Sequence, residues 1–224
     1  MEYIKSKIRD VKDFPTKGVL FKDLTTVFKD PRALHVIGWD LSQLYRDKGI
    51  TKVVGIESRG FIGGSILAFE LGAGFVPARK PGKLPADTIR AEYKKEYGTD
   101  VIEMHRDAIG PDDVVVLHDD VLATGGTMAA AYELVKSMNP KKVYINFIIE
   151  LSALNGRAAL PADAEVTSLI VYCFACDADM AIIFRPVGIA CALGGANVTS
   201  LLIGRLPAVF SRGASKLIIL FRTE

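Results

Sequence analysis

The chain has 224 residues, half of them apolar and 24% charged, with 28 basic and 26 acidic side chains and a net charge of +2. That apolar content excludes an intrinsically disordered chain, and the near balance of charge excludes the strongly basic surface by which proteins hold nucleic acid. The length suits one globular domain of enzyme size, or at most two small ones.

Features that would place the chain in a membrane or outside the cell are weak. The opening residues mix charged and apolar side chains, so they predict no secretory leader and we expect a cytoplasmic protein. The stretch between Arg185 and Arg205 lacks charge but contains a proline and four glycines, so no membrane span is predicted there. Cys173 and Cys176 have CxxC spacing, yet without nearby histidines they predict ordinary thiols.

Short apolar runs alternate with helical patterns through residue 172. We predict buried strands at 52–57, 114–117, 143–149 and 167–172, and helices at 60–71 and 127–138. Continuous apolar strands interleaved with helices are typical of an α/β protein with a central, mostly parallel sheet flanked by helices. Ligands of such sheets bind beyond the carboxyl ends of the strands.

The segment 79–107 interrupts this alternation. It is rich in charge, glycine and proline and poor in apolar periodicity, so we expect a long loop, with Ile102 and Met104 returning as a strand. Long loops inside compact domains are often functional, and here a lid over a site is favoured.

The most informative stretch is VVVLHDDVLATGGTM at 114–128. A buried strand delivers Asp119 and Asp120, and a loop of small residues then enters a helix. Such a loop exposes backbone N–H groups at the positive end of the helix dipole, which suits a phosphate monoester. The two acids could accept hydrogen bonds from ribose hydroxyls or hold a divalent metal through water. The alternative is a plain surface turn with Thr124 capping the helix.

With this motif the chain resembles the type I phosphoribosyltransferases, and among them those that act on adenine. The matching blocks are FPTKGVLFKDLTTVFKDP (14–31), GIESRGFIGG (55–64), ARKPGKLP (78–85), EYG (96–98) and IELSALNGR (149–157). The resemblance implies that family's fold, with a flexible lid loop and a small hood. It covers Asp13 to about Tyr172, so we expect a transferase domain at 1–172 and an unmatched extension at 173–224.

The resemblance also implies a reaction. A 5-phosphoribosyl group would pass from phosphoribosyl pyrophosphate to N9 of adenine, giving AMP and pyrophosphate through a transition state with oxocarbenium character. Mg²⁺ is the expected cofactor, held through the substrate pyrophosphate and water rather than by a set of protein ligands. Asp119 and Asp120 would lie on the ribose hydroxyls. The 5′-phosphate would be held by Ala123, Thr124, Gly125, Gly126 and Thr127.

Cations are expected around the leaving pyrophosphate. The resemblance places Arg59 there first, followed by Arg79, Lys80 and Lys83, although Lys83 reads equally well as a solvated lysine. An arginine at a helix start opposes the helix dipole, so we expect an anion beside Arg59. The resemblance further implies a strained, non-proline peptide bond between Glu57 and Ser58.

Proton transfer and base recognition rest on the resemblance alone. Glu96 matches a glutamate proposed to handle the purine proton, and Tyr97 follows it on the lid. The adenine pocket would be formed by Leu20, Phe21, Lys22 and Leu151. Without the resemblance, Leu20 and Phe21 read equally well as plain core residues.

Two departures and two alternatives remain. Residues 173–224 have no counterpart, and His118 replaces an apolar strand residue, which could bring pH dependence near the acids. The chain could act on another base, such as a 6-oxopurine, or be a regulator that senses phosphoribosyl pyrophosphate and binds nucleic acid. The neutral charge of the first 172 residues disfavours the regulator. Members of the family are typically homodimers, and we expect the same here.

Overall fold

The computed structural model describes residues 1–94 and 99–173, and the chain divides into two units. The first unit consists of Met1–Asp10 and Lys22–Tyr172 and holds the central sheet with its helices. The described part of the second unit is Val11–Phe21 with Cys173. The Arg185–Arg205 stretch and Cys176 lie outside the described residues, in which no helix is long and apolar enough to span a membrane.

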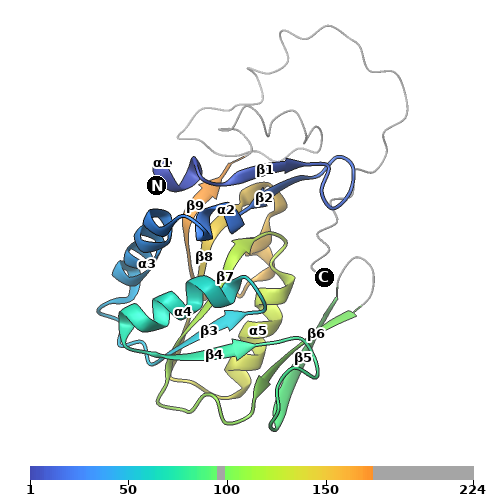
Figure 1. Cartoon of the computed structure of the whole chain (residues 1–224). Helices are drawn as coiled ribbons and strands as arrows, with labels where there is room; N and C mark the ends of the chain where they lie inside the picture. The colour runs from blue at the N-terminus through green and yellow to red at the C-terminus, as the bar shows by residue number, and fades with distance from the viewer. Residues whose placement is uncertain (95–98, 174–224) are drawn as a thin grey trace, which may run out of the picture. The chain divides into compact units, whose positions relative to one another are not determined.

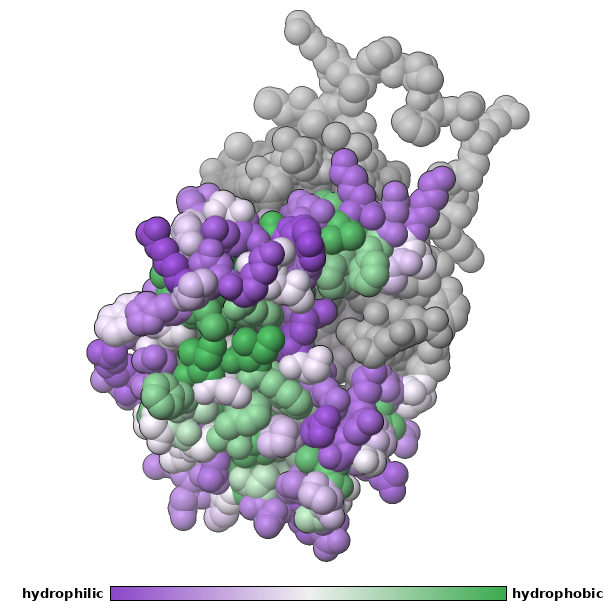
Figure 2. Space-filling view, in the orientation of Figure 1, coloured by the Kyte–Doolittle hydropathy of each residue, from purple (hydrophilic) through white to green (hydrophobic). Residues whose placement is uncertain are grey.

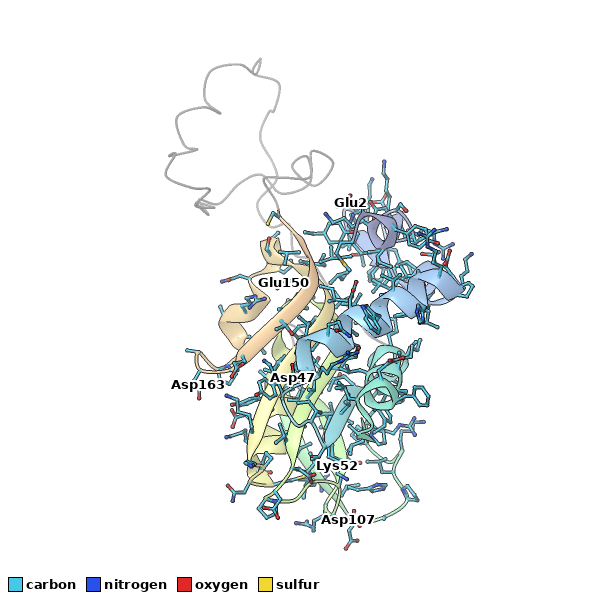
Figure 3. The ribbon with its side chains drawn as sticks, turned by 90° about the vertical axis from the view of Figure 1, so that its left-hand side faces the viewer. Glu2, Asp47, Lys52, Asp107, Glu150 and Asp163 are labelled. Carbon is cyan, nitrogen blue, oxygen red and sulfur yellow. The ribbon has the colours of Figure 1, made fainter. Side chains whose placement is uncertain are left out.

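The first unit is built on a five-stranded sheet in which every neighbouring pair is parallel (Figure 1). In spatial order the strands are β4 (Gly74–Ala78), β3 (Lys52–Ile56), β7 (Val114–Leu122), β8 (Lys142–Leu151) and β9 (Glu165–Tyr172). The predicted α/β class and its four buried strands are therefore confirmed. Figure 3 labels Lys52, at the start of β3, and Glu150, near the end of β8, at opposite ends of this sheet.

Strand β7 is longer than predicted. Residues from His118 onward were expected to form a loop, but the strand runs on to Leu122, which pairs with Glu150 of β8. The backbone N–H and C=O groups of β7 are hydrogen-bonded to the neighbouring strands, so the strand can continue through residues with polar side chains. The two acids consequently lie within a rigid strand and not in a loop.

Helices cover both faces of the sheet. Helices α3 (Pro31–Tyr45) and α4 (Gly60–Leu71) cover one face, and α5 (Gly126–Ser137) covers the other (Figure 1). Helix α4 has the predicted bounds, α5 begins one residue before the predicted helix, and α3 was not predicted.

The predicted long loop at 79–107 is largely wrong. Its residues form an antiparallel hairpin of β5 (Thr88–Lys94) and β6 (Thr99–His105). The return of Ile102 and Met104 as a strand is confirmed, and both side chains are buried in the core shared with α5. Alternate apolar residues of β5 pack beside that core, and their burial outweighs the charges between them. The flexible lid and the small hood stay predictions.

Short elements complete the described chain. They are α1 (Glu2–Lys5), β1 (Arg9–Lys12), β2 (Leu20–Asp23), α2 (Thr25–Phe28), η1 (Ser152–Leu154) and η2 (Gly156–Ala159). Strands β1 and β2 form a two-stranded sheet of their own. The short 3₁₀ helices η1 and η2 connect β8 to β9.

Candidate active site

A carboxylate and a guanidinium meet at the carboxyl end of β7. The Arg59 Nε donates a hydrogen bond of 2.5 Å to the Asp120 carboxylate, which is only 2% exposed. Burial lowers the pKa of Arg59, but the charge and hydrogen bond of Asp120 outweigh it and raise the pKa, so Arg59 stays ionised. Arg59 also starts α4. The anion that the sequence predicts beside it is therefore the Asp120 carboxylate in this structure.

Asp119 experiences the opposite electrostatic balance. Its Oδ1 accepts a hydrogen bond of 2.9 Å from the backbone N–H of Asp120. Burial, followed by the negative charge of Asp120, raises the pKa of Asp119 well above its usual value of 3.8. The pair thus holds one carboxylate in contact with a cation and one acid whose pKa is raised. Such a pair can accept hydrogen bonds from neighbouring hydroxyl groups and donate one to them.

The variant Asp119→Asn is expected to be more heat-stable than the wild type near neutral pH, by about 2 °C or more. A raised folded-state pKa means that the stability of the wild type is fully present below the unfolded pKa and is lost as pH rises through the folded pKa. Asparagine carries no charge and keeps an oxygen for the Asp120 N–H. Melting temperatures measured from about pH 4 to about pH 8 should diverge as pH rises. A difference in melting temperature between the two proteins that stays constant across that pH range would contradict the raised pKa of Asp119.

A glycine turn joins β7 to α5. Gly125 is the residue before the first turn of α5 and has a φ of 82°, a conformation that favours glycine. Gly125 offers no side chain to cap the helix, so its first N–H groups can face a ligand. The alternative that Thr124 caps the helix is therefore wrong. The predicted residues Ala123 to Thr127 do form one continuous turn at a helix N-terminus.

Glu57, just after β3, gathers a second set of cationic and polar groups. Its carboxylate accepts two hydrogen bonds from the Arg79 guanidinium, at 3.1 and 3.2 Å, and one of 2.9 Å from the Lys80 backbone N–H. Burial opposes ionisation of Glu57, but these bonds outweigh it and lower the pKa. The Arg79 guanidinium also donates to the Lys83 carbonyl at 3.1 Å. The Glu57–Ser58 peptide bond is cis, in keeping with the unusual peptide that the resemblance implies.

Sequence reasoning missed two residues near the site. One is Glu57, which the ESRG block contains but which no pattern marks as the partner of Arg79. The other is Tyr93 of β5, whose hydroxyl donates a hydrogen bond of 3.1 Å to Asp100 and whose pKa is influenced by Thr127 and Asp119. Burial raises the pKa of Tyr93 to about 12. The only signal for Tyr93 is its place in an alternating apolar strand.

His118 lies one residue before the acid pair but does not titrate near neutral pH. The imidazole is completely buried, and burial lowers its pKa to about 4. Its Nδ1 lies 2.7 Å from the Asn146 side-chain oxygen, while Nε2 packs against Gly63 with no hydrogen-bond partner in the described part of the chain. The ring is thus a neutral core group between β7 and α4.

The residues predicted to form the base pocket lie in both units. Leu20 and Phe21 belong to the second unit, where the Phe21 ring meets the Phe14 ring edge to face with centroids 5.1 Å apart. Lys22 belongs to the first unit, and its ammonium pairs with Asp10 at 2.8 Å. Leu151 is buried at the end of β8. Glu96 and Tyr97 lie outside the described residues.

The parallel sheet, the acid pair and the uncapped glycine turn together define a phosphoribosyl transferase. Accordingly, the phosphoribosyl transferase domain matches residues 24–175. The adenine phosphoribosyltransferase of Bacteroides thetaiotaomicron is 59% identical over 169 residues, which cover 75% of this chain and 96% of that protein. The chain therefore belongs to the adenine phosphoribosyltransferase family.

Solved structures agree with this assignment. The crystal structure of adenine phosphoribosyltransferase from Rhodothermus marinus is 50% identical with a TM-score of 0.72, covering 76% of this chain and 97% of that one. The Giardia lamblia enzyme complexed with 9-deazaadenine is 45% identical with a TM-score of 0.72, covering 75% of this chain and 96% of that one. These matches show the same fold over the part of the chain that contains the candidate site.

Proposed function

We propose that this chain transfers the 5-phosphoribosyl group of phosphoribosyl pyrophosphate to N9 of adenine, forming AMP and pyrophosphate. The observation that carries the proposal is the acid pair at the end of β7, followed at once by the uncapped N-terminus of α5. One short segment thereby offers carboxylates to a ribose and backbone N–H groups to its phosphate. Membership of the adenine family supports adenine as the acceptor.

The direct experiment is an assay of nucleotide formation from phosphoribosyl pyrophosphate with Mg²⁺. Adenine is supplied alone and beside hypoxanthine, guanine and orotate. Selective formation of AMP supports the proposal, whereas preference for a 6-oxopurine would assign another member of the same chemistry. No product with any base, from a protein that still binds phosphoribosyl pyrophosphate, would favour the regulator.

The 5′-phosphate would lie in the turn from Ala123 to Thr127. The positive φ of Gly125 turns the chain so that the first N–H groups of α5 face a single anion. The Thr127 hydroxyl adds a side-chain donor. The rigid strand before the turn and the helix after it hold the phosphate at a fixed position relative to the ribose.

The ribose would lie beside Asp119 and Asp120. As the bond from the anomeric carbon to pyrophosphate lengthens, positive charge develops on the sugar ring, and a nearby carboxylate stabilises it. Asp120 is held in place by its hydrogen bond from Arg59, while Asp119 has a raised pKa and can share a proton with a ribose hydroxyl. Catalysis here consists of holding fixed charges where the transition state needs them.

The departing pyrophosphate would be held by Arg59, Arg79, Lys80 and Lys83. Among the described residues, no cluster of three or more histidine, cysteine or acidic side chains could hold a metal ion. Mg²⁺ prefers oxygen ligands and keeps several waters, so the substrate pyrophosphate, water and the nearby acids fit it as a group that enters with the substrate. When bound, it would neutralise charge on the leaving group.

The resemblance assigns Leu20, Phe21, Lys22 and Leu151 to adenine, with backbone groups at Leu20 to Lys22 binding the purine edge. Flat apolar walls with a few directional hydrogen bonds suit a neutral heterocycle. Glu96 would take the N9 proton, with Tyr97 beside it on the lid. Because phosphorylated substrates do not cross membranes unaided, a cytoplasmic location is part of the proposal.

We further propose that the enzyme is a homodimer formed through the α4 face. Helix α4 is apolar around much of its circumference, and its Phe69 is 84% exposed and Ile62 39% exposed. Figure 2 shows hydrophobic surface over this helix. Phe69→Asp is expected to weaken self-association at least about tenfold in sedimentation velocity, because a carboxylate would be buried in an apolar interface. Val171→Asp, an exposed site on β9, is the control.

The expected transferase domain at 1–172 predicts that truncation after Tyr172 leaves an active enzyme. In the described part of the chain the last strand of the sheet, β9, ends at Tyr172, and all the proposed site residues precede it. Removing the extension should therefore change kcat by no more than about twofold. Full-length and truncated proteins are compared by AMP formation and by melting temperature. A truncated protein that is soluble only as an unfolded chain would show that the extension completes the core.

A further inference from the structure

The turn proposed to hold the 5′-phosphate packs against the connection between β8 and β9. A Cβ atom at Gly125 would lie 2.3 Å from the Gly156 carbonyl oxygen. In return, a Cβ atom at Gly156 would lie 2.2 Å from the Ala123 carbonyl oxygen and 2.8 Å from the Leu122 side chain. Each backbone therefore occupies the space that a side chain on the other would need. This reciprocal contact fixes the position of the turn relative to the β8–β9 connection.

The connection that supplies Gly156 is itself closed by an ion pair. Arg157 donates two hydrogen bonds to the Glu150 carboxylate, each of 2.8 Å, and a third of 3.2 Å to the Val166 carbonyl. Ser168 donates to the same carboxylate at 2.8 Å. Glu150 is 6% exposed at the end of β8 (Figure 3), and bidentate pairs of this kind hold a defined geometry. The segment from Glu150 to Arg157 is thus tied at both ends.

We propose that Gly156 is a positioning residue for the phosphate turn, with the Glu150–Arg157 pair holding it in place. This inference rests on the proposed function, because it assigns the turn to the 5′-phosphate. In this proposal Gly156 acts on the phosphate through the backbone of Ala123 and Gly125, which it contacts. Leu151, in the proposed base pocket, lies on the same tied segment but five residues away, so the effect should be specific to the phosphate end.

The test uses full-length Gly156→Ala. The added methyl meets a backbone carbonyl, which cannot rotate away, so the turn must shift. We expect the Kd for ribose 5-phosphate, measured by calorimetry, and the KM for phosphoribosyl pyrophosphate to rise about tenfold to a hundredfold. The Kd for pyrophosphate, which lacks a 5′-phosphate, and the KM for adenine should change little. A structural weakening alone would not separate these ligands.

Two further variants make the outcome decisive. Gly110→Ala is the matched control, because a Cβ there would meet its nearest atom at an ordinary 3.8 Å. If Gly156→Ala does not fold, Arg157→Lys, which keeps the charge but loses the two-pronged contact, is expected to weaken ribose 5-phosphate binding selectively and to a smaller degree. Equal loss for ribose 5-phosphate and pyrophosphate, or no loss for either, would overturn the inference. A wild type that binds neither ligand would instead refute the proposed function.

Discussion

The double variant Asp119→Asn, Asp120→Asn is expected to form AMP at least about a thousandfold more slowly than the wild type while keeping its fold. Both carboxylates lie at the end of a strand whose position is fixed by neighbours on either side, so their charges cannot be replaced by a small movement of the chain. An asparagine side chain preserves an acceptor oxygen for the Arg59 guanidinium and another for the Asp120 N–H. The loss therefore reports the carboxyl groups rather than the packing.

Turnover with saturating adenine, circular dichroism and melting temperature are measured together on the same preparation. Asp112→Asn is the control, because it removes the same type of charge from an exposed residue in the loop before β7. Single variants show how the effect divides between the acids, which need not contribute additively. Near-normal turnover by the folded double variant would remove both acids from the proposed mechanism.

The second large effect is expected for Glu96→Gln, with kcat lowered by about a hundredfold or more and adenine affinity changed far less. A general base acts on the proton only as N9 attacks, so its removal raises the barrier without weakening the ground-state complex. Steady-state kinetics are combined with a direct measurement of adenine binding.

Glu92→Gln is the matched control for this experiment, because Glu92 is an exposed glutamate on β5, four residues earlier. Its substitution should leave kcat near the wild-type value. A parallel loss of binding and turnover in Glu96→Gln would assign Glu96 to holding the base rather than to moving a proton.

Local patterns predict the parts of the fold whose structure is decided locally. The apolar runs at 52–57 and 143–149 form strands because a central strand buries both faces of a continuous apolar run. The small and apolar residues of 60–71 give α4 its predicted bounds. The glycine turn before α5 was predictable for the same reason. Its chemistry depends on residues that are neighbours in the chain.

Long-range contacts decide what local patterns missed. The extension of β7 to Leu122 depends on pairing with β8, and no pattern within 118–122 reveals it. The hairpin of β5 and β6 is stabilised by packing beside α5, which follows much later in the sequence. The partners of Arg59 and Arg79 are set by tertiary structure in the same way. Sequence reasoning could predict that Arg59 needs an anion but could not name it.

The cations of this site are already occupied by the protein's own acids. Arg59 is paired with Asp120, and Arg79 with Glu57, so an entering anion must compete with a carboxylate that is already in contact. Free inorganic phosphate can replace one such contact but cannot engage the turn, the acids and both arginines at once. If the two arginines hold pyrophosphate as proposed, Asp120 and Glu57 compete with it and would weaken the binding of small anions such as inorganic phosphate. Under the proposed roles, pyrophosphate and ribose 5-phosphate, which each engage part of the site, would therefore bind more weakly than phosphoribosyl pyrophosphate, which spans it.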